Sequence, residues 1–138
     1  MSCVFCAIIA GAAPASFVHR DDRCVAFMDL RPINPGHLLV VPRTHASALA
    51  DLSADDAAHL MRVAHGLAAA LRSSGLRCEG VNLFYADGEA AGQEVFHAHL
   101  HVFPRHAGDG FGLTFGPHYV VSDRPALDAA AAAIVAAR

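Results

Sequence analysis

Three histidines alternate with apolar residues in the stretch His97-Ala98-His99-Leu100-His101-Val102-Phe103. Successive side chains of a β-strand point to opposite faces of the sheet. A strand over residues 95–104 therefore places all three imidazoles on one face, about 6.5 Å apart along the backbone. An exposed strand face normally mixes Thr, Lys, Glu and Ser, whereas this one carries histidine alone. The pattern indicates a chemical site on one face of the strand and a hydrophobic core on the other.

Two kinds of chemistry fit this row of imidazoles. In the first, His97 and His99 chelate a catalytic metal ion, and a carboxylate or a third histidine completes an open site. In the second, one imidazole is a nucleophile that forms a covalent intermediate, while its neighbours bind the charge of the substrate. A neutral imidazole, with a pKa of about 6.5, attacks phosphorus without a separate base. The row by itself leaves both interpretations open.

The segments around this strand predict an α+β domain. Apolar runs separated by Gly, Pro, Asn and Asp favour strands near residues 16–20, 23–29, 37–42, 80–87 and 95–104. A long helix is expected between Ser53, a typical N-cap residue, and Gly75, a typical residue beyond a helix end. Short terminal helices are expected over 4–10 and 125–136. The sequence thus predicts a mostly antiparallel sheet of about five strands with one long helix.

The composition limits the class of protein. The chain has 138 residues, of which 54% are hydrophobic, enough for the core of one domain. Its net charge is −3, with 10 Lys and Arg against 13 Asp and Glu. It therefore lacks the basic field that nucleic acids or an anionic membrane surface attract. Every one of the ten cations is arginine, and histidine is equally abundant with ten residues.

The sequence does not predict a targeting or membrane segment. The N-terminus has no basic residues ahead of a sustained apolar run. The apolar tract from Ala126 to Ala137 is interrupted by Asp128 and is shorter than the ~20 residues that a spanning helix needs. We therefore expect a cytoplasmic protein with no membrane partner and no nucleic-acid partner.

The four cysteines fall into two groups. Cys3 and Cys6 form a C-x-x-C, which in a reducing compartment indicates metal binding or redox chemistry. Cys24 and Cys78 lie in expected strands or at their edges, and we interpret them as small hydrophobic residues. The histidines at positions 19, 59, 65, 106 and 118 lack metal-ligand spacing and are interpreted as ordinary residues, with His59 on the solvent side of the long helix.

The motifs taken together resemble those of the histidine triad (HIT) family, whose signature is His-φ-His-φ-His-φ-φ with φ apolar, preceded by Gly-Gln-x-Val. The matching segments are Cys3-Val4-Phe5-Cys6-Ala7-Ile8-Ile9, Phe27-Met28-Asp29-Leu30, Asn34-Pro35-Gly36-His37-Leu38-Leu39-Val40-Val41-Pro42, Thr44-His45, Gly92-Gln93-Glu94-Val95, the triad itself and Pro104-Arg105. The likeness covers about residues 3–112 and implies a single HIT domain over 1–138 with a C-terminal extension from about 113.

The resemblance implies hydrolysis at the α-phosphate of a purine nucleotide conjugate, either a phosphoramidate as in the Hint branch or a dinucleoside polyphosphate as in the Fhit branch. It makes His99 the nucleophile that carries the nucleotidyl group, with His101 and His37 around the phosphate. It also implies a homodimer. The implied nucleotide-binding residues are Asp29 for the ribose, Gln93 towards the phosphate, and Phe5, Ile8, Phe27 and Leu30 around the base. Asn82, on the strand next to the triad, is a further candidate or else a polar residue satisfied within the sheet.

Some bacterial members of the family carry a structural zinc ion, and the resemblance implies the same ligands here: Cys3, Cys6, His45 and His97. Two positions depart from the common pattern, because Tyr85-Ala86-Asp87-Gly88 replaces an Asn-containing turn and Glu94 replaces Ser or Thr. A carboxylate facing a phosphate is repulsive unless it is paired, so no phosphate contact is expected from Glu94.

Two other functions remain as alternatives. One is a metal-dependent phosphohydrolase that uses the histidine row as metal ligands. The other is a nucleotide-binding sensor or interaction protein with little turnover.

Overall fold

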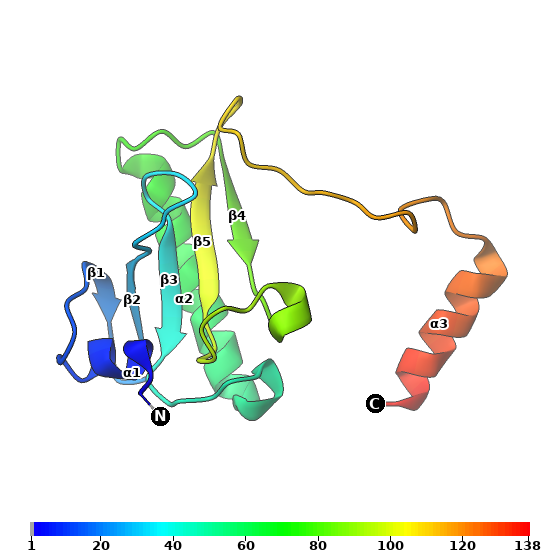
Figure 1. The fold of residues 1–138 in the computed structure, drawn as a ribbon, viewed down its shortest axis with the longest axis horizontal. Helices are drawn as coiled ribbons and strands as arrows, with labels where there is room; N and C mark the ends of the chain where they lie inside the picture. Colours follow the sequence, from blue (N-terminus) through cyan, green and yellow to red (C-terminus); the bar gives the residue numbers. More distant parts are fainter. Residues whose placement is uncertain (1) are drawn as a thin grey trace.

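The computed structural model describes residues 2–138 and shows a five-stranded antiparallel sheet with one long helix across it (Figure 1). The strands are β1 (Phe17–Arg20), β2 (Cys24–Met28), β3 (Leu38–Pro42), β4 (Gly80–Phe84) and β5 (Leu100–Arg105). The helices are α1 (Val4–Ile9), α2 (Ala54–Ser73) and α3 (Arg124–Ala136), with 3-10 turns η1 (Leu49–Asp51) and η2 (Glu89–Ala91). The α+β class expected from the sequence is confirmed.

The strand order β1-β2-β3-β5-β4 places the last strand of the sheet between two earlier ones. On one side, His101 pairs with Leu39 of β3, and on the other it pairs with Phe84 of β4. His37 immediately precedes Leu38, the first residue of β3. This order therefore brings His37 and His101, 64 residues apart in the chain, to neighbouring strands.

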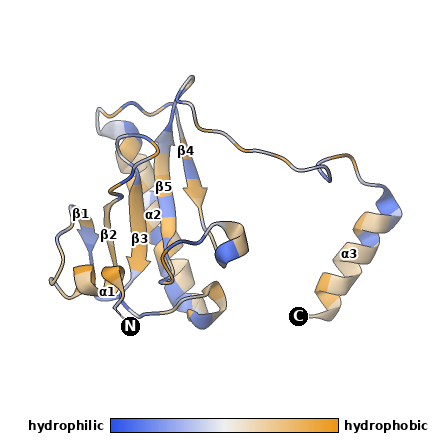
Figure 2. Ribbon diagram, in the orientation of Figure 1, coloured by the Kyte–Doolittle hydropathy of each residue, from blue (hydrophilic) through white to orange (hydrophobic). Residues whose placement is uncertain are grey.

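Period-two alternation divides the core between the two faces of the sheet. One face, with Ala26, Val40 and Val102, packs against the buried stripe of α2. The other face, with Val25, Phe27, Leu39 and Val41, packs against Phe5 and Ile8 of the short helix α1. Figure 2 shows β3, buried on both faces, as a continuous hydrophobic strand. Because α1 is only six residues long, it covers part of its face and leaves the rest open.

Helix α2 forms for the reasons that its sequence suggests. The Ser53 side chain accepts a hydrogen bond from the main-chain N–H of Asp56 at 3.0 Å, which caps the first turn. Asp55 and Asp56 in that turn favour the positive end of the helix dipole. Leu60, Ala64 and Leu71 form the buried stripe that holds the helix on the sheet.

The predicted strand over 95–104 is wrong in its first half, since β5 begins at Leu100. Residues 95–99 are irregular because other groups bond to their main chain. The Ala98 N–H donates to the Ala46 carbonyl, and the Ser47 hydroxyl donates to the Phe96 carbonyl. His97 and His99 therefore precede the strand, and only His101 lies within it. The expected strand over 80–87 is also too long, because β4 ends at Phe84.

Asp21, in the turn between β1 and β2, contacts α2. Oδ2 of Asp21 accepts hydrogen bonds from Nε2 of His19 and from Nε2 of His59, both at 2.7 Å. The expectation that His59 faces solvent is thus wrong, because this turn reaches the helix at that position. Burial opposes ionisation of Asp21, but the hydrogen bonds from His19, the Cys24 N–H and His59 hold its pKa well below the usual range.

The C-terminal segment after Phe111 runs away from the sheet and ends in α3, which stands apart from the body of the chain (Figure 1). Asp123 caps the helix through the Ala126 N–H, and Pro125 occupies its first turn, as expected. The exposed apolar residues of this segment include Leu113, Phe115, Tyr119, Val120, Val121, Leu127, Ile134 and Val135. Among the described residues, none of the helices has the length and apolar character needed to cross a membrane.

Gly36 provides a test of packing at the entrance to β3. Its φ is +107°, and an added Cβ would lie 3.0 Å from Leu71 and 3.2 Å from Pro104. We predict that Gly36→Ala lowers the free energy of unfolding by about 2–4 kcal/mol, from backbone strain and overpacking together. Gly11→Ala is the matched control, because Gly11 has a φ of +79° with nothing within 4 Å of an added Cβ.

Urea denaturation measures both variants. The control should lose only the strain contribution of about 1–2 kcal/mol. Equal losses in the two variants would show that Leu71 and Pro104 do not restrict position 36.

Candidate active site

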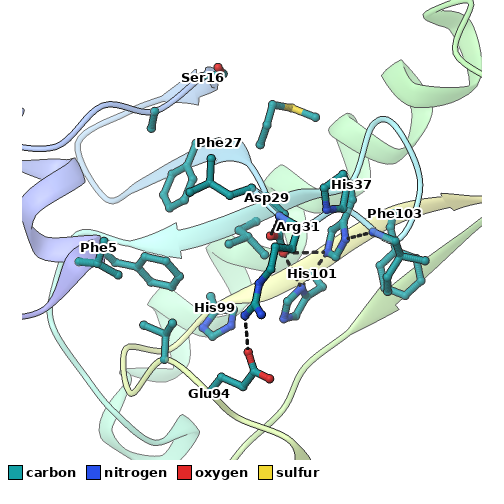
Figure 3. Close-up of a pocket in the computed structure, with 18 of the residues that line it drawn as sticks. Phe5, Ser16, Phe27, Asp29, Arg31, His37, Glu94, His99, His101 and Phe103 are labelled. Carbon is teal, nitrogen blue, oxygen red and sulfur yellow. Dashed lines mark hydrogen bonds and ion pairs between the residues drawn. The ribbon is translucent and has the colours of Figure 1, made fainter.

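A pocket of about 1020 Å³ opens beside α1 on the face of the sheet that carries His101. Its walls come from α1, the end of β2, the loop from Asp29 to His37, and the start of β5 (Figure 3). The residues with functional side chains that line it are Asp29, Arg31, His37, Glu94, His99 and His101. The structure thus gathers the predicted catalytic histidines in one cavity of a size typical for small-molecule sites.

His99 is held with one ring nitrogen free. Its Nδ1 lies 2.7 Å from the main-chain carbonyl of His97, and a carbonyl only accepts, so Nδ1 carries the proton. The other nitrogen, Nε2, therefore bears the lone pair. Within residues 2–138, the hydroxyl of Tyr85 is the one side-chain polar atom that is both sealed from solvent and unpartnered. Nε2 of His99 has no hydrogen-bond partner either, so it must reach solvent through the pocket.

His37 and His101 form a chain of hydrogen bonds that starts at the main-chain N–H of Ile33. This first donor fixes where the protons of both imidazoles lie. The Ile33 N–H donates to Nδ1 of His37 at 3.0 Å, which requires an unprotonated Nδ1. The proton of His37 is then on Nε2, which donates to Nδ1 of His101 at 2.9 Å. His101 consequently carries its proton on Nε2. The rings of His99 and His101 lie 4.9 Å apart between centroids, so the ring with the free lone pair and the ring with the Nε2 proton are neighbours in the pocket.

Burial keeps these imidazoles neutral near pH 7. It lowers the pKa of His99, despite the opposing hydrogen bond to the His97 carbonyl and the nearby charge of Asp29. It also lowers the pKa of His101 to about 4, and the neighbouring His99 and His37 add to that effect. The neutral form of His99 is the one that can act as a nucleophile.

Asp29 directly follows β2, and its carboxylate faces His37 and His101. Its Oδ2 lies 3.5 Å from Nε2 of His37 and 3.9 Å from Nδ1 of His101, while its Oδ1 accepts the Arg31 N–H at 2.9 Å. The carboxylate lines the pocket and is partly exposed, so it remains available to donors from a ligand.

The apolar residues expected around a base all line the same pocket. Phe5, Ile8 and Phe27 are buried at its floor, and the rings of Phe5 and Phe27 meet edge to face at 5.4 Å. Leu30 sits at the rim and is 97% exposed. Its exposure leaves a large apolar surface for a ligand to cover.

Two predicted binding residues lie outside the pocket. Gln93 is buried, where its Oε1 accepts from the Gly88 N–H and its Nε2 donates to the carbonyls of Ser47 and Val95. Its amide therefore positions the segment that leads into the histidines. Asn82 projects from β4 into a different hollow and accepts from Arg105 at 2.8 Å. The fold itself thus satisfies the Gln93 amide and engages the Asn82 oxygen.

A second cluster joins α1 to the segment before β5, with the four predicted metal ligands side by side: Cys3, Cys6, His45 and His97. The Nδ1 atoms of His45 and His97 are 3.2 Å apart, and the sulfur-to-nitrogen separations are 3.4–3.6 Å. A tetrahedral zinc ion, with bonds of about 2.0 Å to nitrogen and 2.3 Å to sulfur, separates its ligands by about 3.3–3.8 Å. Nε2 of His97 donates to the Pro42 carbonyl at 2.8 Å, which leaves Nδ1 free as a ligand.

His97 therefore belongs to the cysteine cluster and not to the pocket. The expectation of three imidazoles on one strand face is wrong for this residue. A catalytic metal bound jointly by His97 and His99 does not fit, because Nε2 of His97 donates to the Pro42 carbonyl and its Nδ1 faces the cysteines, away from the pocket that His99 lines.

Sequence reasoning missed Arg31 and the role of Glu94. Nη2 of Arg31 lies 3.0 Å from Oε2 of Glu94, so the carboxylate that would repel a phosphate when unpaired has a partner. Arg31 carries no motif of its own, and only its position two residues after Asp29 links it to the site. Asp87, the other acidic departure, accepts the Leu49 N–H and lies away from the pocket.

Residues 10–108 match the family model described as the HIT domain, which is more than half of the chain. The chain belongs to the HIT family, a family of nucleotide-binding hydrolases and transferases. Among curated relatives, a protein of Arabidopsis thaliana named adenylylsulfatase is 36% identical over 104 residues, which are 75% of this chain and 52% of the relative.

Solved structures agree with this assignment. A HIT family protein from Bacillus anthracis superposes with a TM-score of 0.91 at 34% identity, covering 99% of this chain and 97% of its own. A Zn-bound histidine triad family protein from Mycobacterium smegmatis is 42% identical with a TM-score of 0.78, covering 100% and 99% of the two chains.

Proposed function

We propose that this protein hydrolyses purine nucleotide conjugates at the α-phosphate through a nucleotidyl-His99 intermediate. The observation that carries the proposal is the free Nε2 of His99 at the pocket, with its Nδ1 proton held by the His97 carbonyl. Membership of the HIT family and similarity to a relative named adenylylsulfatase support the same reaction class.

The first step is an attack by the lone pair of His99 Nε2 on the α-phosphorus. A P–N bond forms, the bond from phosphorus to the leaving group breaks, and its electron pair departs with the leaving group. The imidazole keeps its Nδ1 proton and becomes cationic, and the hydrogen bond to the His97 carbonyl stabilises that charge. His101 donates from Nε2 to the phosphate oxygens, where negative charge develops.

Water then attacks the nucleotidyl phosphorus and breaks the P–N bond. The electron pair returns to Nε2 of His99, and the water releases its proton to solvent or to the departed group. The products are a nucleoside monophosphate and the former leaving group. The base is placed in the apolar part of the pocket against Phe5, Ile8, Phe27 and Leu30, and the ribose hydroxyls donate to Asp29.

Two alternatives lead to different results. A metal-dependent phosphohydrolase would use the remaining His and Asp group in the pocket, Asp29, His37 and His101. The hydrogen bonds from Ile33 to His37 and from His37 to His101 already engage three of the four ring nitrogens of these histidines. A sensor with little turnover would not need the free lone pair on His99.

We predict that His99→Ala lowers kcat/KM by at least about 1,000-fold on both adenosine phosphoramidate and diadenosine tetraphosphate, because it removes the nucleophile. Nucleotide binding should remain within a few-fold of wild type. His65→Ala, a change at an exposed histidine of α2, is the control and should leave the rate unchanged.

Mass spectrometry of quenched wild-type reactions should show the nucleotidyl enzyme. Near-wild-type turnover in the His99 variant would contradict the covalent mechanism. Reversible loss of activity with a chelator and no trapped intermediate would favour the metal-dependent alternative. Absence of turnover on both substrates would favour the sensor.

We propose that Cys3, Cys6, His45 and His97 hold a structural zinc ion. The donor set and its separations fit a closed tetrahedral site, and the M. smegmatis relative is Zn-bound. A cytoplasmic, reducing location would keep both cysteines as ligands rather than as a disulfide. When bound, the ion would crosslink α1 to the segment that carries His97 and so hold the pocket wall in place.

Protein purified without chelator should contain about one zinc ion per chain. Cys6→Ser should lower the zinc content below half and lower the melting temperature by several degrees, because metal binding contributes to folding stability. Cys78→Ser, at a partly buried cysteine outside the cluster, is the control. Full zinc content in the Cys6 variant would exclude this ligand set.

We propose that the protein is a homodimer. Strand β4 ends the sheet with its edge open, and its Leu83 and Phe84 are 40% and 41% exposed. Helix α3 has 13 residues, a length at which isolated helices are only marginally stable, and it lies apart from its own chain. A second copy would cover both surfaces.

Sedimentation equilibrium should give twice the 14.4 kDa mass of one chain. Introducing a charge by Ile134→Asp on α3 should shift the equilibrium towards monomer, because the charge cannot be buried unpaired. Asp128→Ala on the same helix is the control. A monomer mass for wild type at 100 µM would rule out the dimer.

A further inference from the structure

An ion pair crosses the mouth of the pocket. Nη2 of Arg31, in the loop after β2, lies 3.0 Å from Oε2 of Glu94, in the segment before the histidines. Figure 3 shows the Arg31 side chain reaching towards Glu94 in front of the rings of His99 and His101. All four residues line the same pocket, so the guanidinium shares one cavity with the proposed nucleophile.

Arg31 is the one Lys or Arg side chain among the residues that line this pocket. The other fixed charges there are the carboxylates of Asp29 and Glu94. A ligand anion beyond the reacting phosphate therefore has a single fixed cation to bind. It must compete with Glu94 for that cation.

The two ends of Arg31 are held very differently. Its main-chain N–H donates to Oδ1 of Asp29 at 2.9 Å, and the following Pro32 restricts its backbone to extended conformations. Within the described part of the chain, its guanidinium is held only by the pair with Glu94, in which the two side chains are 86% and 77% exposed. Exposed ion pairs contribute little to stability. The side chain thus has a fixed origin and a tip that can exchange one partner for another.

We infer that Arg31 is a specificity-determining residue that binds an oxyanion attached to the reacting phosphate, a second phosphate or a sulfate, and that Glu94 holds Arg31 over the histidines when the pocket is empty. The inference rests on the proposed function. A guanidinium matches the tetrahedral oxyanions of phosphate and sulfate with paired N–H donors.

The chemistry of the leaving group follows from this contact. When the bond between the α-phosphorus and the bridging oxygen breaks, its electron pair leaves on that oxygen, and Arg31 stabilises the added negative charge. An amine leaving group has no oxyanion for Arg31 to bind. The site therefore favours nucleoside phosphosulfates and polyphosphates over phosphoramidates.

The kinetic test compares three substrates: adenylyl sulfate, diadenosine tetraphosphate and adenosine phosphoramidate. Arg31→Gln should lower kcat/KM at least about tenfold on the first two and less than about twofold on the phosphoramidate. Glu94→Gln should raise kcat/KM on the two anionic substrates through a lower KM, because it removes the competing carboxylate. Arg77→Gln, in the other exposed Arg–Glu pair, is the control.

An equal loss on all three substrates, or no loss on any, overturns the inference. A loss confined to adenylyl sulfate identifies the oxyanion as sulfate, and a loss confined to the tetraphosphate identifies it as phosphate. Each of these two outcomes supports the role of Arg31.

A binding experiment separates this inference from the proposed reaction. In the His99→Ala background, ADP should bind at least about threefold more tightly than AMP, and Arg31→Gln should abolish the difference. If wild type cleaves none of the substrates but this dependence on Arg31 holds, the hydrolase proposal fails and the oxyanion site stands. If wild type cleaves them but ADP and AMP bind alike with or without Arg31, the oxyanion site fails and the hydrolase stands.

Discussion

The hydrogen bond from Nδ1 of His99 to the main-chain carbonyl of His97 is the interaction on which the rest of the site depends. It fixes the tautomer of His99 and leaves Nε2 free at the pocket. It is possible only because residues 95–99 do not pair as a strand, since a regular ladder would direct that carbonyl to a neighbouring chain segment. The same irregularity turns the ring of His97 towards Cys3 and Cys6. His97 and His99, which are separated by one residue, therefore have different roles: His97 lies in the cysteine cluster and His99 in the pocket.

The short helix α1 contributes to both the pocket and the cysteine cluster. Phe5 and Ile8 complete the core on one face of the sheet and also form part of the pocket wall. The same helix, with the residue that caps it, supplies Cys3 and Cys6 to the cluster with His45 and His97. A six-residue helix cannot be stable alone, so its position depends on this packing and on the cluster. Any change that loosens the cluster should therefore also loosen the wall against which a nucleotide base would lie.

Several parts of the fold and the site follow from local patterns in the sequence. Ser53, the acidic residues after it and the apolar stripe predict α2. Apolar runs between turn residues predict strands β1 to β4. The histidine alternation holds from Leu100 onward, because β5 is paired on both sides there. It fails at His97 because the main-chain partners of residues 95–98 come from the loop around Ala46 and from Gln93. Nothing local to the triad predicts those partners. The same limitation applies to His59, whose partner Asp21 is 38 residues away.

The sequence by itself determined the class of the fold and the histidine motif, and its resemblance to the HIT family pointed to Asp29 and His37 as partners of that motif. The fold class and the histidine motif depend on side-chain chemistry and on periodicities within single elements. Only the tertiary structure decided which nitrogen of each imidazole carries a proton, that Gln93 and Asn82 bond to other groups away from the pocket, and that Arg31 meets Glu94. The physical reason is that a proton position or an ion pair is set by the nearest partner in space. The strand order β1-β2-β3-β5-β4 brings those partners together from distant parts of the chain.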